Sequence, residues 1–365
     1  MKEQAIQYLA FDVHQATCEV SLRDASGSVA MRGTVPTEAT AILRVVKGAG
    51  PRVHVAFEEG TQAQWLHDLI EPHAERVIVC NLRGERKSGK KNDRADVDEL
   101  SQRLRGGTLR SVFHGTPAVL DLKELVRSYN NLIEDATRVM QRIKAQFRAR
   151  GIKTDGKSVY RPVDRKKWLG KLRGGARVRA EASLKHLDVL LELRPSVKAA
   201  MIAEAKKHAG WKILRSVPFL GPIRAAEILA IMRTPHRFRT KRNLWPYAGL
   251  AVVTHSSADK EIVDGQVRKK KRQPLTRGLN RNHNPMLKEV FKGAATAATV
   301  RPGPLRDFYL ASLERGVPEE LAKVTLARKI AAVTLRLWKK GELWDPDKLT
   351  TQARVAARRS PMIVE

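Results

Sequence analysis

The sequence has very little cysteine and no long apolar run. Its 365 residues include two cysteines, Cys18 and Cys80, which lie in apolar, strand-like surroundings and predict reduced thiols of a cytoplasmic protein. No Cys/His spacing typical of a zinc site occurs. No apolar stretch approaches the roughly 20 residues of a membrane-spanning helix, and the N-terminus lacks a signal-peptide pattern. We therefore expect neither a disulfide-rich secreted protein nor an integral membrane protein.

Acidic residues are also scarce relative to basic ones. The chain has 69 Lys and Arg against 38 Asp and Glu, which gives a formal net charge of +31. A charge of this size repels itself unless a polyanion neutralises it, so nucleic acid is the expected partner. A membrane is not expected as a partner. The apolar share of 42% is sufficient for packed cores, and the length predicts two or three structural units.

The first 112 residues alternate between strand and helix patterns. Three strands joined by short turns come first, and helices then alternate with strands. This order is that of the α/β ribonuclease-H-like fold, in which the first strand lies beside the fourth and the last helix packs over their ends. The predicted strands are Gln4–Asp12, Thr17–Arg23, Ser28–Val35, Arg52–Phe57 and Glu75–Cys80, and the predicted helices are Glu38–Lys47, Thr61–Ile70 and Arg94–Arg105.

Four carboxylates are expected to converge in this fold. Asp12 ends the first strand, Glu58 or Glu59 follows the fourth, and Asp93 and Asp96 begin the last helix. Each acid singly has an ordinary structural explanation, because acids at helix starts favour the helix dipole without any metal. Four together repel one another, so one or two Mg²⁺ ions are the expected occupants. Such ions activate the attacking oxygen and stabilise the leaving one in phosphodiester cleavage.

Residues 113–210 are predicted to be a helical spacer. An apolar heptad stripe across Asp121–Arg148 indicates a coiled-coil seam, formed either between chains or folded back on the same chain. A long helix packed on its own domain is the alternative. A second helical stretch, Ala180–Leu193, is expected to end or kink at Pro195. Two such arms suit an antiparallel hairpin.

A basic, glycine-rich insertion separates these two arms. Over Gly151–Gly175 the composition favours either a mobile linker or a segment that contacts nucleic acid. In the second case Tyr160 and Trp168 are available to stack on bases.

Residues 211–345 are predicted to form a basic, mainly α domain, followed by a basic tail at 346–365. Ser216–Met232 resembles a helix-hairpin-helix element, whose backbone amides hold a phosphate without reading sequence. Ser256 and Ser257 lie among cations that would stabilise a phosphorus atom under attack by a serine, although two serines in a loop are usually just a turn. The cations expected to bind nucleic acid are Lys90, Lys91, Lys241, Arg242, Arg268, Lys269, Lys270, Lys271, Arg272, Arg277 and Arg281.

Short segments of the first 112 residues resemble a known family. FDVH around Asp12, EGT followed by Trp65, and KNDRAD around Asp93 resemble the DEDD transposases of bacterial insertion sequences, a family of bridge-RNA-guided serine recombinases with a RuvC-like N-terminal domain. Trp65 lies six residues after Glu59, as in the family, so the resemblance selects Glu59 over Glu58.

The serine segment resembles the same family. YAGLAVVTHSSADK is similar to the family segment whose serine lies eight residues after its glycine, and counting from Gly249 gives Ser257. Ala258 and Val252 replace the usual glycine and proline, so Ser256 stays open as the alternative.

The resemblance implies a recombinase that exchanges DNA strands. It implies Mg²⁺ at Asp12, Glu59, Asp93 and Asp96, a nucleophilic Ser257, and a structured guide RNA that selects donor and target DNA. It also implies a coiled-coil dimer, a tetramer in the active complex, and a place in the bacterial cytoplasm at the nucleoid. Two other functions stay open: a RuvC-like junction endonuclease without covalent serine chemistry, and a non-catalytic basic protein that binds nucleic acid.

Overall fold

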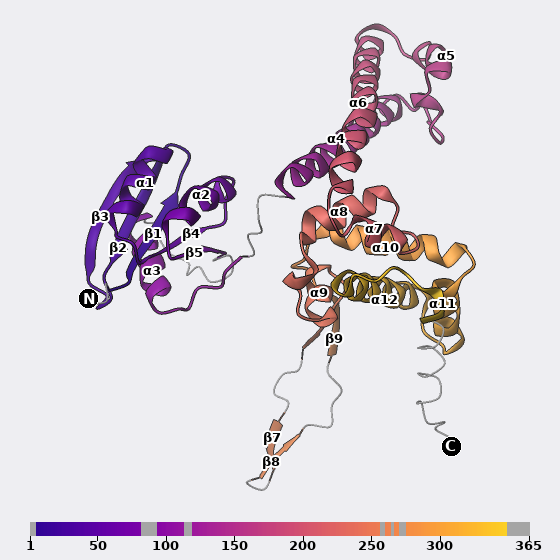
Figure 1. Cartoon of the computed structure of the whole chain (residues 1–365). Helices are drawn as coiled ribbons and strands as arrows, with labels where there is room; N and C mark the ends of the chain where they lie inside the picture. Colours follow the sequence, from indigo (N-terminus) through magenta and orange to yellow (C-terminus); the bar gives the residue numbers. More distant parts are fainter. Residues whose placement is uncertain are drawn as a thin grey trace. The chain divides into compact units, whose positions relative to one another are not determined.

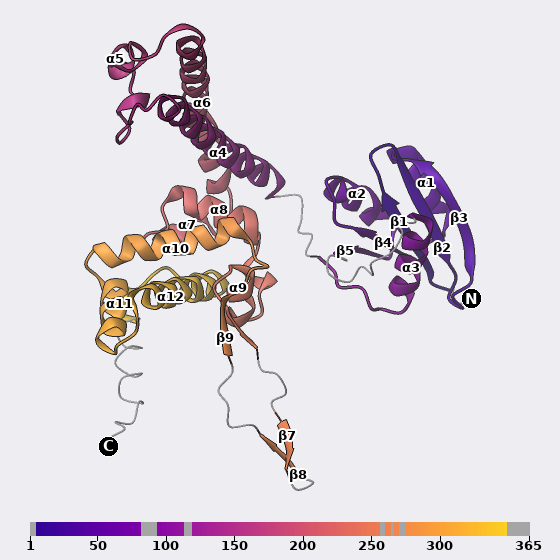
Figure 2. The same cartoon turned by 180° about the vertical axis from the view of Figure 1, so that it is seen from behind.

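The computed structural model of the chain divides into two compact units, Met1–Pro117 and Ala118–Glu365. It describes residues 5–81, 93–112, 119–255, 260–263, 266–269 and 275–348, with the backbone alone at 93–94 and over most of 254–277. Figures 1 and 2 show opposite views, and each unit is considered by itself. Within these ranges no helix combines the length and the apolar character of a membrane span.

The first unit is a five-stranded mixed sheet with helices on both faces (Figure 1). Its strand order is β3-β2-β1-β4-β5; β1 pairs antiparallel with β2 and parallel with β4. The predicted element order and the predicted neighbourhood of the first and fourth strands are confirmed, and both are compatible with a ribonuclease-H-like domain. The elements are β1 (Gln7–Val13), β2 (Thr17–Arg23), β3 (Val29–Pro36), α1 (Ala39–Gly48), β4 (Val53–Glu58), α2 (Ala63–Ile70), β5 (Arg76–Cys80) and α3 (Asp93–Arg105).

Two small cores hold this sheet, one on each face. Leu9 and Phe11 of β1 are fully buried against the side that carries α1 and α2. Ala10, the residue between them, is buried on the opposite side with Leu100 and Leu104 of α3. Since successive side chains of a strand point to opposite faces, this alternation settles which residues of β1 lie under α3.

A long helical hairpin opens the second unit. Helices α4 (Leu120–Arg148) and α6 (Gly174–Lys206) run side by side in both views (Figures 1 and 2) and share a core along the outer part of the hairpin. The expected antiparallel hairpin is confirmed. Of the two expectations at Pro195, an end of the helix is wrong, because α6 continues through that residue; a kink there stays a prediction. Pro195 is exposed, so its ring lies toward solvent rather than in the packed face.

The basic insertion between the two arms is folded into a cap, so the prediction of a mobile linker is wrong. It contains α5 (Arg165–Leu169) and two short 3₁₀ turns, and Val159 is fully buried. The Tyr160 hydroxyl donates a hydrogen bond to the Met140 carbonyl oxygen at 2.9 Å, and the Trp168 ring meets Phe147 edge-on. These aromatic rings pack on the cap's core instead of standing free for base stacking.

The foot of the hairpin belongs to the largest core of the chain. Leu122, Val126 and Tyr129 of α4 are buried there with the C-terminal helices, so the heptad stripe of α4 packs within this chain. A coiled coil between chains stays a prediction, as does a domain boundary at 210/211. The remaining helices are α7 (Trp211–Ser216), α8 (Pro222–Met232), α9 (Lys241–Tyr247), α10 (Pro285–Val300), α11 (Pro304–Glu314) and α12 (Glu319–Lys340).

Four short strands interrupt the helical domain and depart from the mainly α prediction. β6 (Val252–His255) pairs with β9 (Leu275–Leu279), and β7 (Lys260–Val263) pairs with β8 (Gln266–Lys269), both antiparallel. Each strand has only four or five residues, and charged side chains interrupt the apolar alternation. Period-two patterning is weak over such lengths, so the sequence gives little signal for these strands.

Candidate functional site

The acidic site is built at the carboxyl ends of two parallel strands. β1 and β4 are paired up to Phe11 and Phe57, so Asp12 and Glu58 are the next residues along the two neighbouring strands. Phe11 and Phe57 point into the core under α1 and α2. The alternation of a strand therefore directs Asp12 and Glu58 toward the α3 side of the sheet. Because Glu58 points to the same side of the sheet as Asp12, Glu58 stays a candidate site residue together with Glu59.

One cavity of about 240 Å³ brings these acids together. Asp12, Glu58 and Glu59 all line it, as does His14. The Glu59 backbone N–H donates to the Cys80 carbonyl oxygen at 2.8 Å, which ties the end of β4 to β5. His14 Nε2 lies 3.4 Å from Asp12 Oδ2. His14 was not among the predicted site residues, although its position two residues after Asp12 was the signal for a shared face.

The predicted acids of α3 lie at the start of that helix. Val97, Leu100 and Leu104 form its buried face, and position 93 precedes them at helical spacing of four and seven residues. Asp96 is exposed. The Asp93 side chain lies outside the described residues.

Carboxylate oxygens are the donors that Mg²⁺ prefers, so the chemistry of the donor set fits the expected metal. Among the described side chains, however, no group of three or more His, Cys, Asp and Glu is close enough to hold a metal ion. The basic loop with Lys90 and Lys91 lies outside the described ranges.

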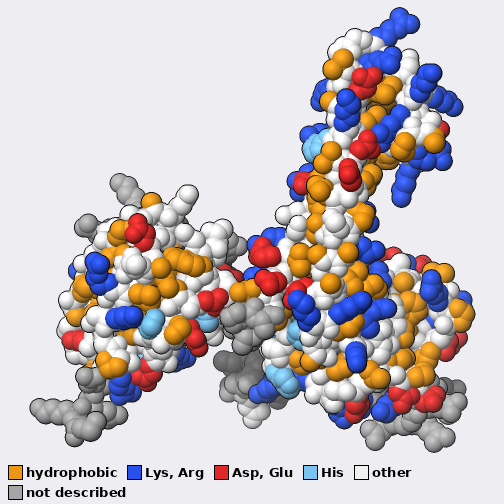
Figure 3. All heavy atoms as spheres, turned by 45° about the horizontal axis from the view of Figure 1, so that its top comes forward, with side chains coloured by type: hydrophobic (Ala, Val, Ile, Leu, Met, Phe, Trp, Pro, Cys, Tyr) orange, Lys and Arg blue, Asp and Glu red, His pale blue; other side chains and the backbone are white. Residues whose placement is uncertain are grey.

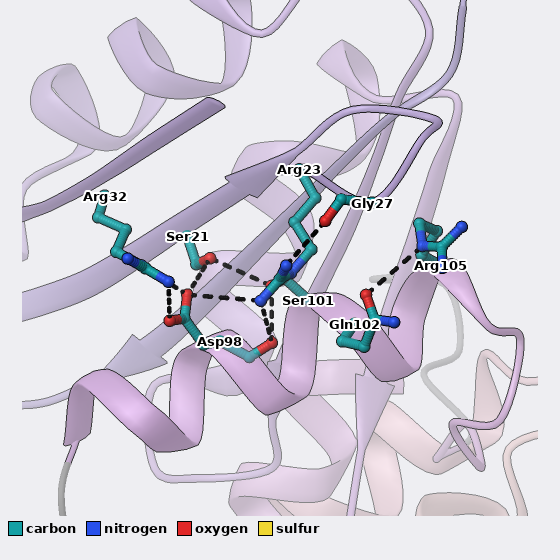
Figure 4. A network of polar contacts seen from close by, with 8 residues as sticks. All are labelled: Ser21, Arg23, Gly27, Arg32, Asp98, Ser101, Gln102 and Arg105. Atoms are coloured by element: carbon teal, nitrogen blue, oxygen red, sulfur yellow. Dashed lines mark hydrogen bonds and ion pairs between the residues drawn. The ribbon is translucent and has the colours of Figure 1, made fainter. Parts of the chain in front are cut away.

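An ion-pair network clamps α3 onto the sheet (Figure 4). Asp98 Oδ1 accepts hydrogen bonds from Ser21 Oγ at 2.7 Å and from Arg32 Nε at 3.0 Å. Arg23 Nε donates to Ser101 Oγ at 2.8 Å, one turn further along the helix. The clamp joins α3 to β2 and β3, and it sits five residues after position 93. It therefore sets where the start of α3 lies relative to the strand ends.

The clamp holds Asp98 in its ionised form. Burial acts to raise the pKa of Asp98, but hydrogen bonds from Arg32 and Ser21 and the charges of Arg32 and Arg23 outweigh it, so the pKa lies below its ordinary value. Asp98 is thus an acid of the KNDRADVD segment with a structural role. Sequence reasoning did not single it out, because its partners are some 66 to 77 residues away along the chain.

The predicted serine lies just beyond a described strand. β6 ends at His255, so Ser256 and Ser257 lie outside the described residues, as do Lys270, Lys271 and Arg272. For Arg268, Lys269 and Arg277 the structure gives the backbone alone, on β8 and β9. These residues stay candidates.

The turn before β6 explains the glycine of the YAGL segment. Gly249 has a φ of +62°, and a Cβ there would lie 2.5 Å from His283 Cδ2. A side chain at this position would be strained by the backbone and would also collide with the imidazole ring. A hydrogen bond holds the loop that begins at Asn280 against the end of α9, since Asn280 Nδ2 donates to the Pro246 carbonyl oxygen at 2.9 Å.

A basic cluster stands beside the root of β6. Lys241, Arg242 and Arg281 are exposed, as expected of residues that bind nucleic acid. Lys329 of α12 is partly buried, and its pKa is lowered by burial and then by the charges of Lys241 and Arg336. A buried cation whose charged form is disfavoured by neighbouring cations favours an anion beside it. Sequence reasoning missed Lys329 and Arg336, although they lie seven residues apart on one face of α12.

The predicted helix-hairpin-helix has a supporting geometry. Phe219 stands where such a hairpin usually has its first glycine, and its φ of +67° is in the left-handed region that glycine favours. The turn is held by Arg224 Nη1, which donates to the Phe219 carbonyl oxygen at 2.9 Å. The segment joins α7 to α8, and α8 begins with Pro222 directly after Gly221.

The cap of the arm is a strongly basic surface. Residues 141–180 contain fourteen Lys and Arg against two Asp. Figure 3 shows basic side chains gathered around the tip of the arm. Lys166, Lys167 and Arg173 are exposed, and Lys171 lies over the Trp168 ring with its Nζ 4.3 Å from the centroid. The Trp168 ring thus contacts a cation of the same segment.

Two stretches of the chain match models of known protein families. Residues 9–149 match the family model of DEDD transposases of the IS110 type, described as "Transposase", and residues 211–310 match "Transposase IS116/IS110/IS902 family". A curated relative, the insertion element IS116 uncharacterized 44.8 kDa protein of Streptomyces clavuligerus, is 29% identical over 141 residues. The matched stretch covers 39% of this chain and 32% of that relative.

Proposed function

Since the chain belongs to the IS110/IS116 family of transposases, we propose that it cleaves and exchanges DNA strands of an insertion sequence, using an acidic metal site and a serine nucleophile. The observation that carries the proposal is the meeting of Asp12, Glu58 and Glu59 around one cavity at the ends of parallel strands. The two matched stretches together span about two thirds of the chain and include residues of both units, which supports a role for each.

In the proposed acidic site, Asp12, Glu59, Asp93 and Asp96 hold Mg²⁺, with Glu58 as the alternative to Glu59. When bound, the metal would supply the charge that activates an attacking oxygen and stabilises a leaving one. The contribution of the chain is to hold the carboxylates in register. Pairing of β1 with β4 does this for the strand acids, and the Asp98 clamp does it for α3.

The proposed nucleophile is the Ser257 hydroxyl, with Ser256 as the alternative. Its Oγ would form a bond to phosphorus while the bond from phosphorus to a sugar oxygen breaks, and the departing sugar oxygen takes up a proton. The phosphoserine link keeps a phosphodiester available for rejoining. Cations beside the root of β6, such as Lys241, support this role because they would stabilise the charge on phosphorus.

We further propose that a structured RNA selects donor and target DNA, and that the active complex is a tetramer built from coiled-coil dimers. Base pairing with a guide would leave no sequence code in the protein itself. The net charge of +31 and the basic cap of the arm support a polyanion load larger than a single duplex. In this proposal the protein works in the bacterial cytoplasm at the nucleoid.

Strand exchange between supercoiled donor and target plasmids tests the proposal. Ser257→Ala should abolish exchange, while Ser256→Ala, its matched neighbour, should leave most of it. Asp12→Ala should also abolish exchange. Exchange that survives Ser257→Ala would refute the serine mechanism, and nicking without exchange would favour a junction endonuclease. If Asp12→Ala and Asp93→Ala leave every activity unchanged, the protein is a binding protein alone.

The guide is tested on the purified protein. A discrete bound RNA should be present, and its removal by nuclease should abolish exchange. Strand exchange by a protein that carries no RNA would refute the proposal that a guide RNA selects the DNA.

A further inference from the structure

A second cavity, in the second unit, is far larger than the acidic site. It measures about 730 Å³ and lies among α4, α8 and α10, which supply Asn130, Glu227 and Met286 to its wall. A volume of this size is within the range of small-molecule sites. The cavity shares no residue with the acidic site, and the proposed strand-exchange chemistry makes no use of it.

The wall combines apolar and polar side chains. Apolar side chains make up much of it, among them Ile133, Pro222, Ile223, Pro285 and Val290. The polar residues of the wall come from three separate helices and converge on the same space: Asn130, Glu134, Arg224, Glu227, Asn284 and Glu289.

Glu227 is the group that sets the chemistry of the cavity. Burial raises its pKa to about 7, against a hydrogen bond from Asn130 and the charge of Arg224, which lower it; the charge of Glu289 raises it further. A carboxylate held in so costly a position, inside a cavity, is a candidate for binding a ligand. Once ionised it has two acceptor oxygens and no donor.

We propose that this cavity binds a single unstacked guanine base, with the Glu227 carboxylate accepting hydrogen bonds from the two adjacent N–H donors of its Watson–Crick edge. The inference rests on the proposed function, because a nucleic-acid partner supplies the base. Proteins commonly read single-stranded bases by enclosing them between side chains and hydrogen-bonding this edge.

The choice of guanine follows from the donors of the four bases. Guanine presents N1–H and the N2 amino group side by side, and a carboxylate accepts both. Adenine and cytosine each place a ring nitrogen acceptor beside their amino group, and the imino N–H of thymine or uracil lies between two carbonyl oxygens. Each of these puts an acceptor against a carboxylate oxygen, which is repulsive. Guanine therefore fits the ionised Glu227 better than the other three.

The surroundings also suit the phosphate attached to such a base. α8 and α10 both begin at the cavity, with Pro222 and Pro285 as their first residues, and the amide groups of a first helical turn attract anions. Arg224 lies in the same wall. Two further carboxylates line the cavity: Glu134, which forms an exposed ion pair with Arg138 at 2.9 Å, and Glu289.

A mononucleotide titration of the full-length protein tests the proposal. At pH 8, guanosine 5′-monophosphate should bind at least roughly tenfold more tightly than inosine 5′-monophosphate, which lacks the N2 amino group, because a hydrogen bond to a charged acceptor is lost. Glu227→Gln should abolish this ratio, whereas Glu289→Gln, its matched neighbour at the cavity, should keep it. The ratio should also fall toward one as the pH drops below 7, and comparing two monophosphates cancels the titration of the phosphate itself.

Three outcomes would overturn the proposal. One is binding of neither nucleotide at millimolar concentration, and another is an equal affinity for both. The third is binding of an arginine-rich peptide, such as TQARVAARRS from residues 351–360, to the wild type but not to Glu227→Gln, with no binding of guanosine monophosphate; the cavity would then be a peptide site. Because no strand exchange is measured, these outcomes are separate from failure of the recombinase proposal.

Discussion

Replacing Glu227 with glutamine is expected to stabilise the second unit in a way that depends on pH. The ordinary pKa of a glutamate is near 4.5, and burial raises that of Glu227 to about 7. The folded state therefore holds a proton that the unfolded state releases between these two values. Stability contributed by protonated Glu227 is fully present below pH 4.5 and is lost as the pH rises to about 7.

The size of the effect follows from the shift. Each pKa unit corresponds to 1.36 kcal/mol, so ionising Glu227 in the folded protein costs about 3 kcal/mol at pH 8. Glutamine has nearly the same shape and retains a hydrogen bond with Asn130, but it carries no charge to desolvate. Glu227→Gln should thus raise the free energy of unfolding by up to about 3 kcal/mol at pH 8 and by almost nothing at pH 4.5.

Urea unfolding followed by tryptophan fluorescence measures this difference. Five of the six tryptophans lie in the second unit and one, Trp65, in the first, so the signal reports mainly on the unit that contains Glu227. Glu289→Gln is the control for loss of a negative charge at the same cavity and should change stability little. Equal stability of Glu227→Gln and wild type at pH 8, or a gain that is the same at pH 8 and pH 5, would refute the reasoning.

Three further changes have defined expectations. Asp98→Ala removes the acceptor of Ser21 and Arg32 and should destabilise the first unit by about 2 kcal/mol, seen as faster hydrogen exchange in α3; unchanged exchange would mean that the clamp is not what holds the helix. Gly249→Ala should cost about 2 kcal/mol in urea unfolding, with part of the loss recovered by adding His283→Ala, and no loss would contradict the close approach. Lys241→Ala should lower the slope of log affinity against log salt for duplex DNA by about 1; an unchanged slope would remove Lys241 from the interface.

Features of the chain that depend on local pattern could be predicted from the sequence. The strands around Leu9–Phe11 and the crossover order of the first unit follow from alternation and turn residues, which act over a few positions. The hairpin of α4 and α6 follows from apolar spacing in the same way. Asp12 and the acids after β4 could be brought together in advance because carboxyl ends of neighbouring parallel strands meet at one edge.

Features that depend on distant partners could not be predicted. In the sequence Asp98 is one of several acids near a helix start, and only the structure shows that Ser21 and Arg32 bind it. The raised pKa of Glu227 depends on burial between helices that begin about 60 to 165 residues apart along the chain. A helix end at Pro195 was the wrong alternative, because local sequence does not reveal that the proline ring faces solvent while the helix continues.

Helix α4 connects two places that were described separately. It has 29 residues, so at 1.5 Å per residue it is about 43 Å long. Its C-terminal end supports the basic cap, and Asn130 and Ile133, near its middle, line the large cavity. The 18 residues that follow Asn130, up to Arg148, make a lever of about 27 Å, so a polyanion that displaces the cap would rotate α4 slightly against α8 at the cavity.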